Sequence, residues 1–399
     1  GSDLRLKITD IKTFNVYTYR TNYVFVKIET DEGISGIGEG TLEYKEHALL
    51  GAIEDLKRVL IGQDPREVER ICHELYRDSY WRVGPVLQSA ISALNIAMWD
   101  IKAKALQVPL YELLGGKVRD SVRMYANVWF AGAKEPDEFA AAAKKAVAMG
   151  VTALKWDPFG KAYLYMDNQE FFHAIEIVEA VRAAVGSSVD LLIEGHGRFD
   201  VATGIRIANA LKPFDPMFFE EPAPPDSLDA LAEVHRKSPV PIAAGERIYS
   251  VTQFQQFLEK GCADFVQPDV SHCGGISAVK KMAAMAEPYY VALAPHNPSG
   301  PVANAATLHL AAYTPGFRIL EICLTDVNWR GELTNEHVVF DHGKIRIPEG
   351  VGLGLALNEE NCAKYPFQPV DLRHYKGTLT NVRPAGASSY YFDGLPAVD

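Results

Sequence analysis

Apolar residues alternate with polar ones through much of residues 4–40, a pattern that is typical of strands. The segment YVFVKIET is followed by the turn sequence Asp31-Glu32-Gly33 and then by ISGIGEG. Two strand-like segments joined in this way predict a β-hairpin near the start of the chain.

Between residues 46 and 115 the spacing of apolar residues changes to that of helices. They recur there at intervals of three and four, as in Leu49, Ile53, Leu56 and Leu60, in Val68, Ile71 and Leu75, and in Ile91, Leu94 and Met98. Gly115 and Gly116 follow the last such segment and mark a helix end. We therefore predict an α+β domain over residues 3–120, with its strands before its helices.

From residue 121 to residue 325, short apolar segments alternate with helical ones. The apolar segments are MYANVWF, TALKW, DLLIE, MFFEE, PIAAGE, DFVQPD, YVALAPH and RILEI. This α/β alternation predicts a parallel TIM-type (β/α) barrel. Residues 326–399 lose the alternation, and FDHGKIRI within them predicts a strand that returns to the first domain.

The apolar segments of the predicted barrel end in ionisable residues. Glu194, Glu220 and Glu246 follow one another at intervals of 26 residues. Because active-site residues gather at the C-terminal ends of barrel strands, three carboxylates would converge there and repel unless a cation lay between them. Hard oxygen ligands predict Mg²⁺, with Mn²⁺ as a substitute. Glu221 is the alternative ligand at its strand, and the simpler interpretation is that these acids only cap helices.

Asp269, His296 and Glu321 continue this series, and a second histidine, His196, lies close to its first member. Asp269 and His296 end neighbouring strands, so a hydrogen bond between them would fix the tautomer of the imidazole and raise its basicity. His196 follows Glu194 by two residues and, in an extended chain, would face the same site from the side opposite His296. A base and an acid so placed suit proton removal at one carbon and loss of a leaving group from the next. A structural His–Asp pair and an ordinary loop histidine are the alternatives.

Other residues near the barrel mouth are weaker candidates for substrate contacts. They are Lys155, Asp157, Arg198, Arg247 and Trp81. Arginines at a barrel mouth often serve only loop ion pairs, so their type alone does not assign them to a substrate.

The net charge and the cysteine content indicate which kinds of molecule the protein binds and in which compartment it lies. The 399 residues carry a net charge of -11, which argues against nucleic acid or an anionic membrane surface. The five cysteines form no CxxC pair, which favours a reducing cytoplasm. No apolar stretch reaches the length of a membrane span, and no signal-peptide pattern opens the chain, so we expect a cytoplasmic protein acting on a small molecule.

At these residues the chain resembles the enolase superfamily, in its mandelate racemase-like branch, and most of all the galactonate and gluconate dehydratases. The stretches that carry the resemblance are YWRVGP, ALNIAMWDIKAK, GHGRFD, FFEEPAPP, AAGERIYS, QPDVSHCGGI and LAPHNPSGP. The resemblance implies a modified (β/α)7β barrel under an N-terminal α+β capping domain. It also implies a homo-oligomer, either a dimer or an octamer.

The resemblance further implies a role for each site residue. These roles are Mg²⁺ ligation by Glu194, Glu220 and Glu246, general base catalysis by His296 with Asp269, general acid catalysis by His196, a hydrogen bond near the enediolate from Glu321, and contact with the distal end of a polyol acid by Tyr19. The implied reaction is the dehydration of a sugar acid, an aldonate such as galactonate or gluconate, to a 2-keto-3-deoxy acid.

Two positions depart from the pattern of these relatives. Glu194 stands where most have Asp, and Asp157 stands where racemases of the branch carry the second lysine of a Lys-x-Lys motif. Asp157 therefore speaks against racemisation through a lysine. An epimerase or cycloisomerase acting through the same metal-stabilised enediolate stays open as an alternative, as does a metal-binding protein without activity on this fold.

Overall fold

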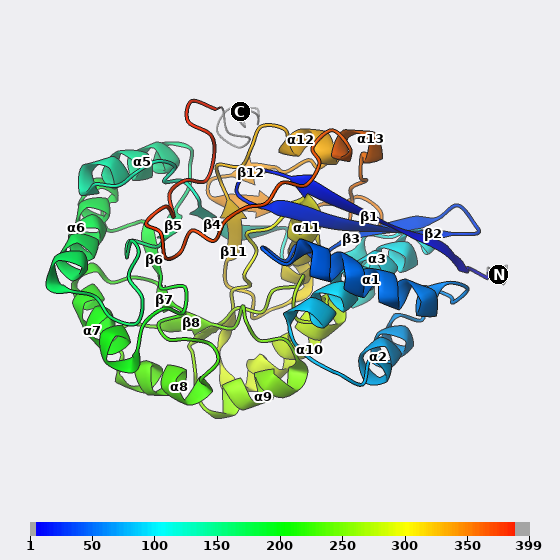
Figure 1. The fold of residues 1–399 in the computed structure, drawn as a ribbon, viewed down its shortest axis with the longest axis horizontal. Helices are drawn as coiled ribbons and strands as arrows, with labels where there is room; N and C mark the ends of the chain where they lie inside the picture. Colours follow the sequence, from blue (N-terminus) through cyan, green and yellow to red (C-terminus); the bar gives the residue numbers. More distant parts are fainter. Residues whose placement is uncertain (1–4, 388–399) are drawn as a thin grey trace.

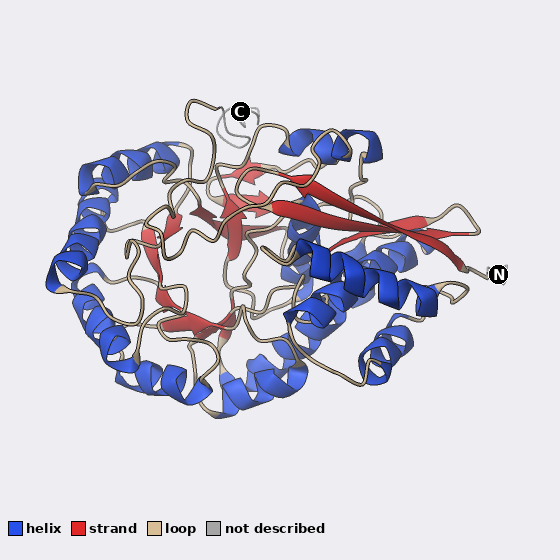
Figure 2. Ribbon diagram, viewed as in Figure 1, coloured by secondary structure: helices blue, strands red, loops and turns tan. Residues whose placement is uncertain are grey.

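The computed structural model describes residues 5–387 and sets a small antiparallel sheet with its helices beside a ring of parallel strands (Figures 1 and 2). The sheet is built from β1 (Ile8–Tyr17), β2 (Asn22–Thr30) and β3 (Ser35–Glu39), paired in that order. The helices of this capping domain are α1 (Glu46–Leu60), α2 (Val68–Asp78), α3 (Pro85–Ala105) and α4 (Leu110–Leu114). The predicted order, strands and then helices, is confirmed.

Helix α3 packs on β3 at very short range and also joins the capping domain to the barrel. A Cβ added to Gly38 would stand 1.9 Å from the carbonyl oxygen of Ala93, so only glycine permits this approach. On the barrel side, Ser277 Oγ contacts Asn95 Nδ2 at 2.8 Å and Trp99 Nε1 at 3.0 Å. The two parts are thus held together by buried hydrogen bonds.

The barrel follows the predicted alternation segment by segment. Its strands are β4 (Ser121–Asn127), β5 (Ala153–Trp156), β6 (Asp190–Glu194), β7 (Phe218–Glu220), β8 (Ile242–Ala244), β9 (Phe265–Val266), β10 (Ala292–Leu293) and β11 (Leu320–Cys323). Its helices are α5 (Pro136–Ala148), α6 (Asn168–Val185), α7 (Val201–Leu211), α8 (Leu228–Lys237), α9 (Val251–Glu259), α10 (Ile276–Ala286) and α11 (Pro301–Tyr313), with short 3-10 helices at Lys212–Phe214 and Glu287–Tyr289.

Parallel pairing runs from β10 through β9, β8, β7, β6 and β5 to β4, and β11 pairs with the other side of β4. The seam between β10 and β11 has no ladder. A parallel bridge joins Leu293 to Phe317, and Arg318 N donates to Leu293 O at 2.7 Å. One buried residue from each strand or its immediate flank fills the interior: Tyr125, Ala153, Leu192, Phe218, Ala243, Phe265, Ala294 and Ile319. The strands therefore enclose a packed interior.

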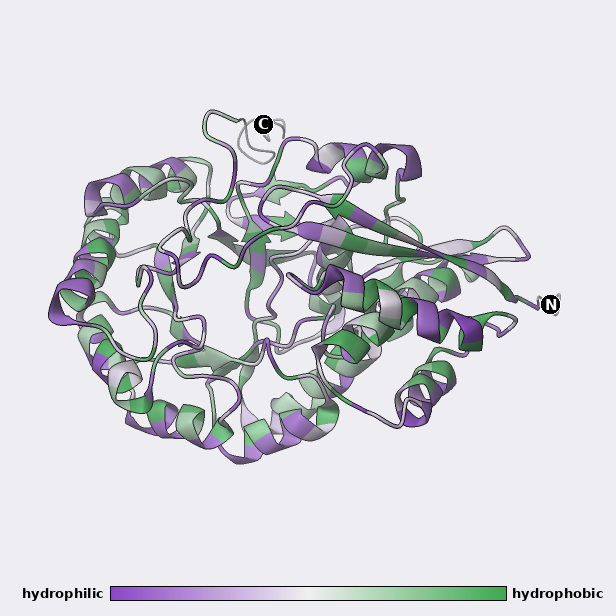
Figure 3. Cartoon of the chain, viewed as in Figure 1, coloured by the Kyte–Doolittle hydropathy of each residue, from purple (hydrophilic) through white to green (hydrophobic). Residues whose placement is uncertain are grey.

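Most of the surrounding helices are amphipathic, whereas α11 is buried along nearly its whole length. Hydrophobic and hydrophilic bands alternate along α5 to α9 in Figure 3. In α6 the buried residues Phe171, Ala174, Ile177, Val178 and Val181 recur at helical spacing, so one side faces the strands. Within residues 5–387, no helix is both long and apolar enough to cross a membrane.

The chain after the barrel runs back over both parts of the molecule. It contains α12 (Arg330–Leu333), β12 (Phe340–Asp341), β13 (Lys344–Arg346) and α13 (Glu359–Cys362). The expectation that FDHGKIRI joins the capping domain is wrong, because β12 and β13 form a hairpin that pairs antiparallel with the start of β4. The return to the capping domain comes later, where Tyr17 N donates to Tyr365 O and Asn22 Nδ2 to Gln368 O.

Candidate active site

A cavity of about 400 Å³ lies at the C-terminal ends of the barrel strands. Residues 42–45 of the capping domain and residues 372–375 of the C-terminal region line it together with residues at and just beyond the strand ends. Three distant parts of the sequence thus enclose one polar space. Of the ionisable residues predicted from the strand ends, Glu194, Glu246, His296 and Glu321 line it, whereas Glu220 and Asp269 are buried behind the lining.

The carboxylates at the ends of neighbouring strands do converge. Glu194 ends β6 and lies beside Glu220, which ends β7, and Glu246 follows β8 by two residues. Burial, together with the negative charges of Glu220 and Glu246, holds the pKa of Glu194 well above its usual range. Burial also raises the pKa of Glu246. This is the repulsion that a bound cation would relieve.

Glu220 and Glu221 differ in their partners. Glu221 accepts two hydrogen bonds from Arg247, at 2.7 and 3.0 Å, so both of its oxygens are engaged. Glu220 uses only Oε2, which accepts from Lys155 at 2.7 Å. Ligand atoms of Glu194, Glu221 and Glu246 also lie within 4.8 Å of one another, so a site that uses Glu221 is geometrically open. We favour Glu220 because one of its oxygens is uncommitted.

The carboxylate cluster fits Mg²⁺. Glu220 Oε1 and Glu246 Oε1 are buried and have no hydrogen-bond partner among the described residues. A buried carboxylate oxygen without a partner is costly, and a hard divalent cation is the ligand that suits several such oxygens at once. Acidic groups that could hold a cation are therefore present, and the exact set of Glu194, Glu220 and Glu246 stays a prediction. A bound Mg²⁺ would offset the repulsion among these carboxylates.

Lys155 is the internal counter-ion of this cluster. Its Nζ lies 2.7 Å from Glu220 Oε2, 2.7 Å from Glu321 Oε2 and 3.0 Å from the Tyr125 hydroxyl. Burial opposes its charge, but the surrounding carboxylates outweigh burial and keep the pKa of Lys155 well above its usual range. An ammonium group has three donors, and all three have partners here. The predicted contact of Lys155 with substrate is thus not available without breaking one of them.

Glu321, which lies within β11 rather than at its end, is equally committed. Its carboxylate accepts from Lys155, from Asn127 Nδ2 at 3.0 Å and from the backbone N of Asn297 at 2.8 Å. It therefore positions its neighbours in this structure, and its expected hydrogen bond near the substrate stays a prediction.

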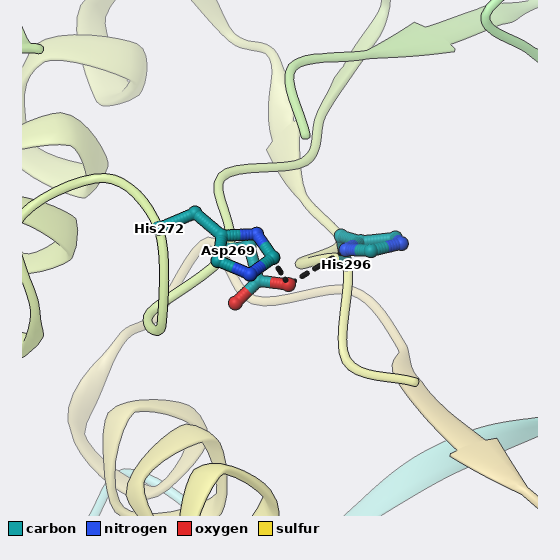
Figure 4. A group of neighbouring side chains, drawn as sticks. All are labelled: Asp269, His272 and His296. Atoms are coloured by element: carbon teal, nitrogen blue, oxygen red, sulfur yellow. Dashed lines mark hydrogen bonds and ion pairs between the residues drawn. The ribbon is translucent and has the colours of Figure 1, made fainter. Parts of the chain in front are cut away.

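The predicted pair, which follows β9 and β10, lies within hydrogen-bond distance. His296 Nδ1 is 2.6 Å from Asp269 Oδ2 (Figure 4). Its Nε2 is 3.0 Å from Glu246 Oε2. Burial lowers the pKa of His296, but the charges of Glu246 and Asp269 outweigh it and raise the pKa to about 10. The position of Asp269 assigns the Nδ1 proton to the shared hydrogen bond and turns Nε2 toward the carboxylate cluster.

His272, which sequence reasoning missed, faces the same carboxylate. Its Nδ1 lies 3.5 Å from Asp269 Oδ2, and its Nε2 lies 2.7 Å from the Thr41 carbonyl oxygen of the capping domain. Asp269, His272 and His296 have the composition of a metal site. However, 2.6 Å between His296 and Asp269 is a hydrogen-bond length and is too short for two ligands of one tetrahedral ion.

His196 also has a carboxylate partner. Its Nδ1 lies 2.5 Å from Asp157 Oδ2, and Arg198 contacts both oxygens of that carboxylate, at 2.5 and 2.6 Å. Burial raises the pKa of Asp157, but Arg198 and His196 outweigh it, so the pKa is lowered and the carboxylate is charged. Asp157 thus belongs to a second imidazole–carboxylate dyad rather than to the weak substrate contacts.

The expected reason for the placement of His196 is wrong, although the residue does line the cavity. The chain is not extended there, because His196 has φ 51° and lies in a turn. Its backbone N donates to Glu194 Oε1 at 2.7 Å, which ties the turn to the carboxylate cluster. His196 follows the third strand of the ring and His296 the seventh, so the two dyads stand on opposite sides of the cavity.

The remaining candidates differ in position. Arg247 lines the cavity and also donates to the His196 carbonyl oxygen at 3.0 Å. Arg198 is fully buried, is bonded to protein groups and does not line the cavity, so its predicted substrate contact has no support in this structure. Trp81 is 84% exposed and does not line the cavity, and Tyr19 donates its hydroxyl to Asn381 outside the lining. Trp81 and Tyr19 therefore do not line the cavity, and their contact with substrate stays a prediction.

His374 is another functional candidate that the sequence did not reveal. Its ring packs edge-on against His196, with centroids 4.4 Å apart. It belongs to an irregular segment without strand or helix spacing, so no local pattern could place it at the barrel mouth.

Known proteins resemble this chain over most of its length. Residues 10–115 match the mandelate racemase/muconate lactonizing enzyme N-terminal domain, and residues 138–361 match the enolase C-terminal domain-like family. A D-galactonate dehydratase of Ralstonia nicotianae is 37% identical over 89% of this chain and 93% of its own. A D-gluconate dehydratase of Thermoproteus tenax is 36% identical over 88% and 71%.

Solved structures agree with these sequence matches. A member of the enolase superfamily from Salmonella Typhimurium superposes with a TM-score of 0.87 at 33% identity, covering 90% of this chain and 98% of the other. A mandelate racemase/muconate lactonizing enzyme-like protein from Roseovarius sp. TM1035 gives 0.87 at 33% identity, covering 92% and 97%. The shared fold therefore includes both the capping domain and the barrel.

Proposed function

This chain belongs to the mandelate racemase/muconate lactonizing enzyme family of the enolase superfamily, and from that premise we propose that it is a sugar-acid dehydratase. The substrate is an aldonate such as D-galactonate or D-gluconate, because the similar proteins carry those names. The enzyme would remove the proton α to the carboxylate and expel the β-hydroxyl, which gives a 2-keto-3-deoxy acid and water. The observation that carries the proposal is the pair of dyads on opposite sides of the carboxylate cluster.

His296 is the proposed general base. Asp269 holds its Nδ1, so Nε2 is the atom that takes the α-proton. Mg²⁺ held by Glu194, Glu220 and Glu246 would supply positive charge beside the substrate carboxylate and make that proton more acidic. The base must be neutral before it acts, and its contact with Glu246 favours the protonated form as long as Glu246 keeps its full charge.

His196 is the proposed general acid. Asp157 fixes its Nδ1, and the other ring nitrogen is left to give a proton to the departing hydroxyl. Arg198 locks Asp157 through both carboxylate oxygens, so the acid has a defined orientation. Lys155 is not proposed as a base, because its raised pKa keeps it protonated.

The two dyads also support a second candidate, an epimerase. A carboxylate partner on each histidine would let one remove a proton and the other return one on the opposite face. This reaction keeps every hydroxyl, whereas dehydration loses one. The identity of the product therefore separates the two functions.

A cytoplasmic location is part of the proposal. Each of the five cysteines is a free thiol in the structure, which favours a reducing compartment. The homo-oligomeric state remains a prediction.

A screen of hexonates and pentonates with Mg²⁺, assayed for 2-keto acid formation, tests the dehydratase proposal. We expect turnover of at least one aldonate and loss of turnover in His296→Asn. His235 offers a matched control. Its Nε2 lies 3.0 Å from Asp264 Oδ1, and neither residue lines the cavity. His235→Asn should keep full activity. Failure of every hexonate and pentonate to yield a keto acid would contradict the proposal.

A further inference from the structure

We propose that residues 372–382, here called the strap, bind the end of the substrate that lies farthest from its carboxylate, through the side chains of Arg373 and His374. The inference rests on the sugar-acid function proposed above and adds the part of the chain that recognises the polyol end. It assigns substrate specificity to a segment beyond the barrel.

The strap lies across the mouth of the barrel, as the red segment in front of the strands in Figure 1. Leu372, Arg373, His374, Tyr375, Leu379 and Val382 line the cavity from this side. Arg20 and residues 42–45 of the capping domain line it as well. A substrate in the cavity can therefore contact both the strap and the capping domain.

Hydrogen bonds from three parts of the chain anchor the strap. Arg198 donates to the His374 carbonyl oxygen at 3.0 Å, and Gly132 N donates to Thr380 O at 2.9 Å. The Tyr19 hydroxyl donates to the Asn381 side chain at 2.8 Å. The strap thus presents its side chains from a fixed backbone, which limits the entropy lost when a ligand binds.

Two nitrogen atoms of the strap are buried without partners. Arg373 Nε and His374 Nδ1 have no hydrogen bond among the described residues, whereas Arg373 also donates from its Nη1 to the Asn381 carbonyl oxygen. Leaving such groups unpaired is unfavourable, and both are on residues that line the cavity. Oxygen atoms of a bound polyol are suitable partners.

The order of groups along the cavity places these atoms at the distal end. The carboxylate cluster and His296 lie at the strand ends, where the reacting carbons must be. His374, which lines the cavity from the strap, packs edge-on against His196 of the acid dyad. Arg373 follows it in the strap and lies near Tyr44 and Arg20 of the capping domain. A sugar acid that offers its carboxylate to the cluster therefore extends past His196 toward the strap.

The chemistry of the two residues suits hydroxyl groups. Burial and the nearby His196 lower the pKa of His374 to about 2, so the ring is neutral and offers one donor and one acceptor. The Arg373 guanidinium adds donors in a fixed plane. Such a set matches hydroxyls, which both give and accept hydrogen bonds.

Substrate length provides the test. Binding of a six-carbon and a four-carbon aldonate is measured by titration calorimetry with Mg²⁺ in the His296→Asn background, which removes turnover. Arg373→Met keeps the length of the side chain and removes its donors. We expect it to weaken binding of the six-carbon acid about tenfold or more, and that of the four-carbon acid less than about twofold. Lys376→Met is the matched control, because Lys376 is exposed, pairs with Asp371 and does not line the cavity.

Equal weakening for both acids, or no weakening for either, would overturn the role of the strap. The four-carbon acid also reports whether the variant keeps a folded site. Binding does not depend on the reaction that follows, so the strap can prove correct even if the wild-type protein dehydrates neither acid. If neither acid binds to the background protein, the inference fails together with its premise.

Discussion

Nδ1 of His196 lies 2.5 Å from Oδ2 of Asp157, and this pair repeats, on the other side of the cavity, the contact between His296 and Asp269. In both cases the carboxylate follows one strand and the histidine follows the next along the ring. The site therefore has two oriented imidazoles rather than one base and a lysine. We propose that His196 is the general acid and His296 the general base.

Asp157→Asn should separate the two halves of the reaction. The amide cannot hold His196 as a charged carboxylate does, so we expect kcat for dehydration to fall about 10²-fold. The base is untouched, so exchange of the α-proton with D₂O should continue. Asp269→Asn serves as the comparison and should suppress exchange as well. Equal loss of exchange in both variants would show that Asp157 does not act through the acid.

Glu220→Gln should impair metal binding far more than Glu221→Gln does. Glu220 Oε1 is uncommitted, whereas Arg247 engages both oxygens of Glu221. We expect Mn²⁺ affinity, measured by electron paramagnetic resonance, to fall about 100-fold or more for the first change and less than about tenfold for the second. The reverse order would assign the ligand to Glu221.

Mg²⁺ should lower the pKa of His296. Without the cation, Glu246 and Asp269 outweigh burial and raise this pKa to about 10. Mg²⁺ at Glu246 would offset the charge that stabilises the protonated ring, so proton and cation oppose each other's binding. NMR titration of the His296 ring, assigned with His296→Asn, should show a lower pKa when Mg²⁺ is added. The same pKa of His296 with and without Mg²⁺ would exclude this coupling between proton and cation binding.

His309 should lower the free energy of unfolding as the pH falls below 6.5. Burial lowers its pKa from 6.5 to about 4, and its ring accepts from Tyr111 N and lies 3.0 Å from Leu353 O. The unfolded chain takes up the proton first, so stability present above pH 6.5 is lost as the pH falls toward 4. The loss is on the order of 3 kcal/mol.

Urea unfolding of wild type and His309→Gln at several pH values measures this contribution. We compare slopes rather than absolute values: the free energy of unfolding of the variant should decline less steeply between pH 6.5 and pH 4 than that of the wild type. Parallel curves would mean that His309 does not contribute to the acid sensitivity.

The strand-end residues show how far the sequence could be interpreted. Apolar segments that end in Glu194, Glu220 and His296 fixed both the order of strands and the face of the site, because a parallel barrel brings all such ends together. The same rule could have paired Asp157 with His196, since they follow neighbouring strands. The resemblance to racemases hides this pair, because it aligns Asp157 with their second lysine rather than with Asp269.

Other features depend on contacts that no local pattern records. His374 lies in an irregular segment, and hydrogen bonds from Arg198, Gly132 and Tyr19 hold that segment at the barrel mouth. Lys155 was visible as a strand-end residue, but its three partners come from three other strands. Spacing along the chain predicts which residues reach the mouth, and packing decides which of them have free atoms.

The most direct test of the account is the product formed from D-galactonate or D-gluconate with Mg²⁺ in D₂O, followed by NMR. Dehydration by His296 and His196 predicts a 2-keto-3-deoxy acid that has lost the C3 oxygen and gained deuterium at C3. An acid with every hydroxyl retained, and deuterium at C2 in an inverted configuration, would contradict it and would establish the epimerase instead.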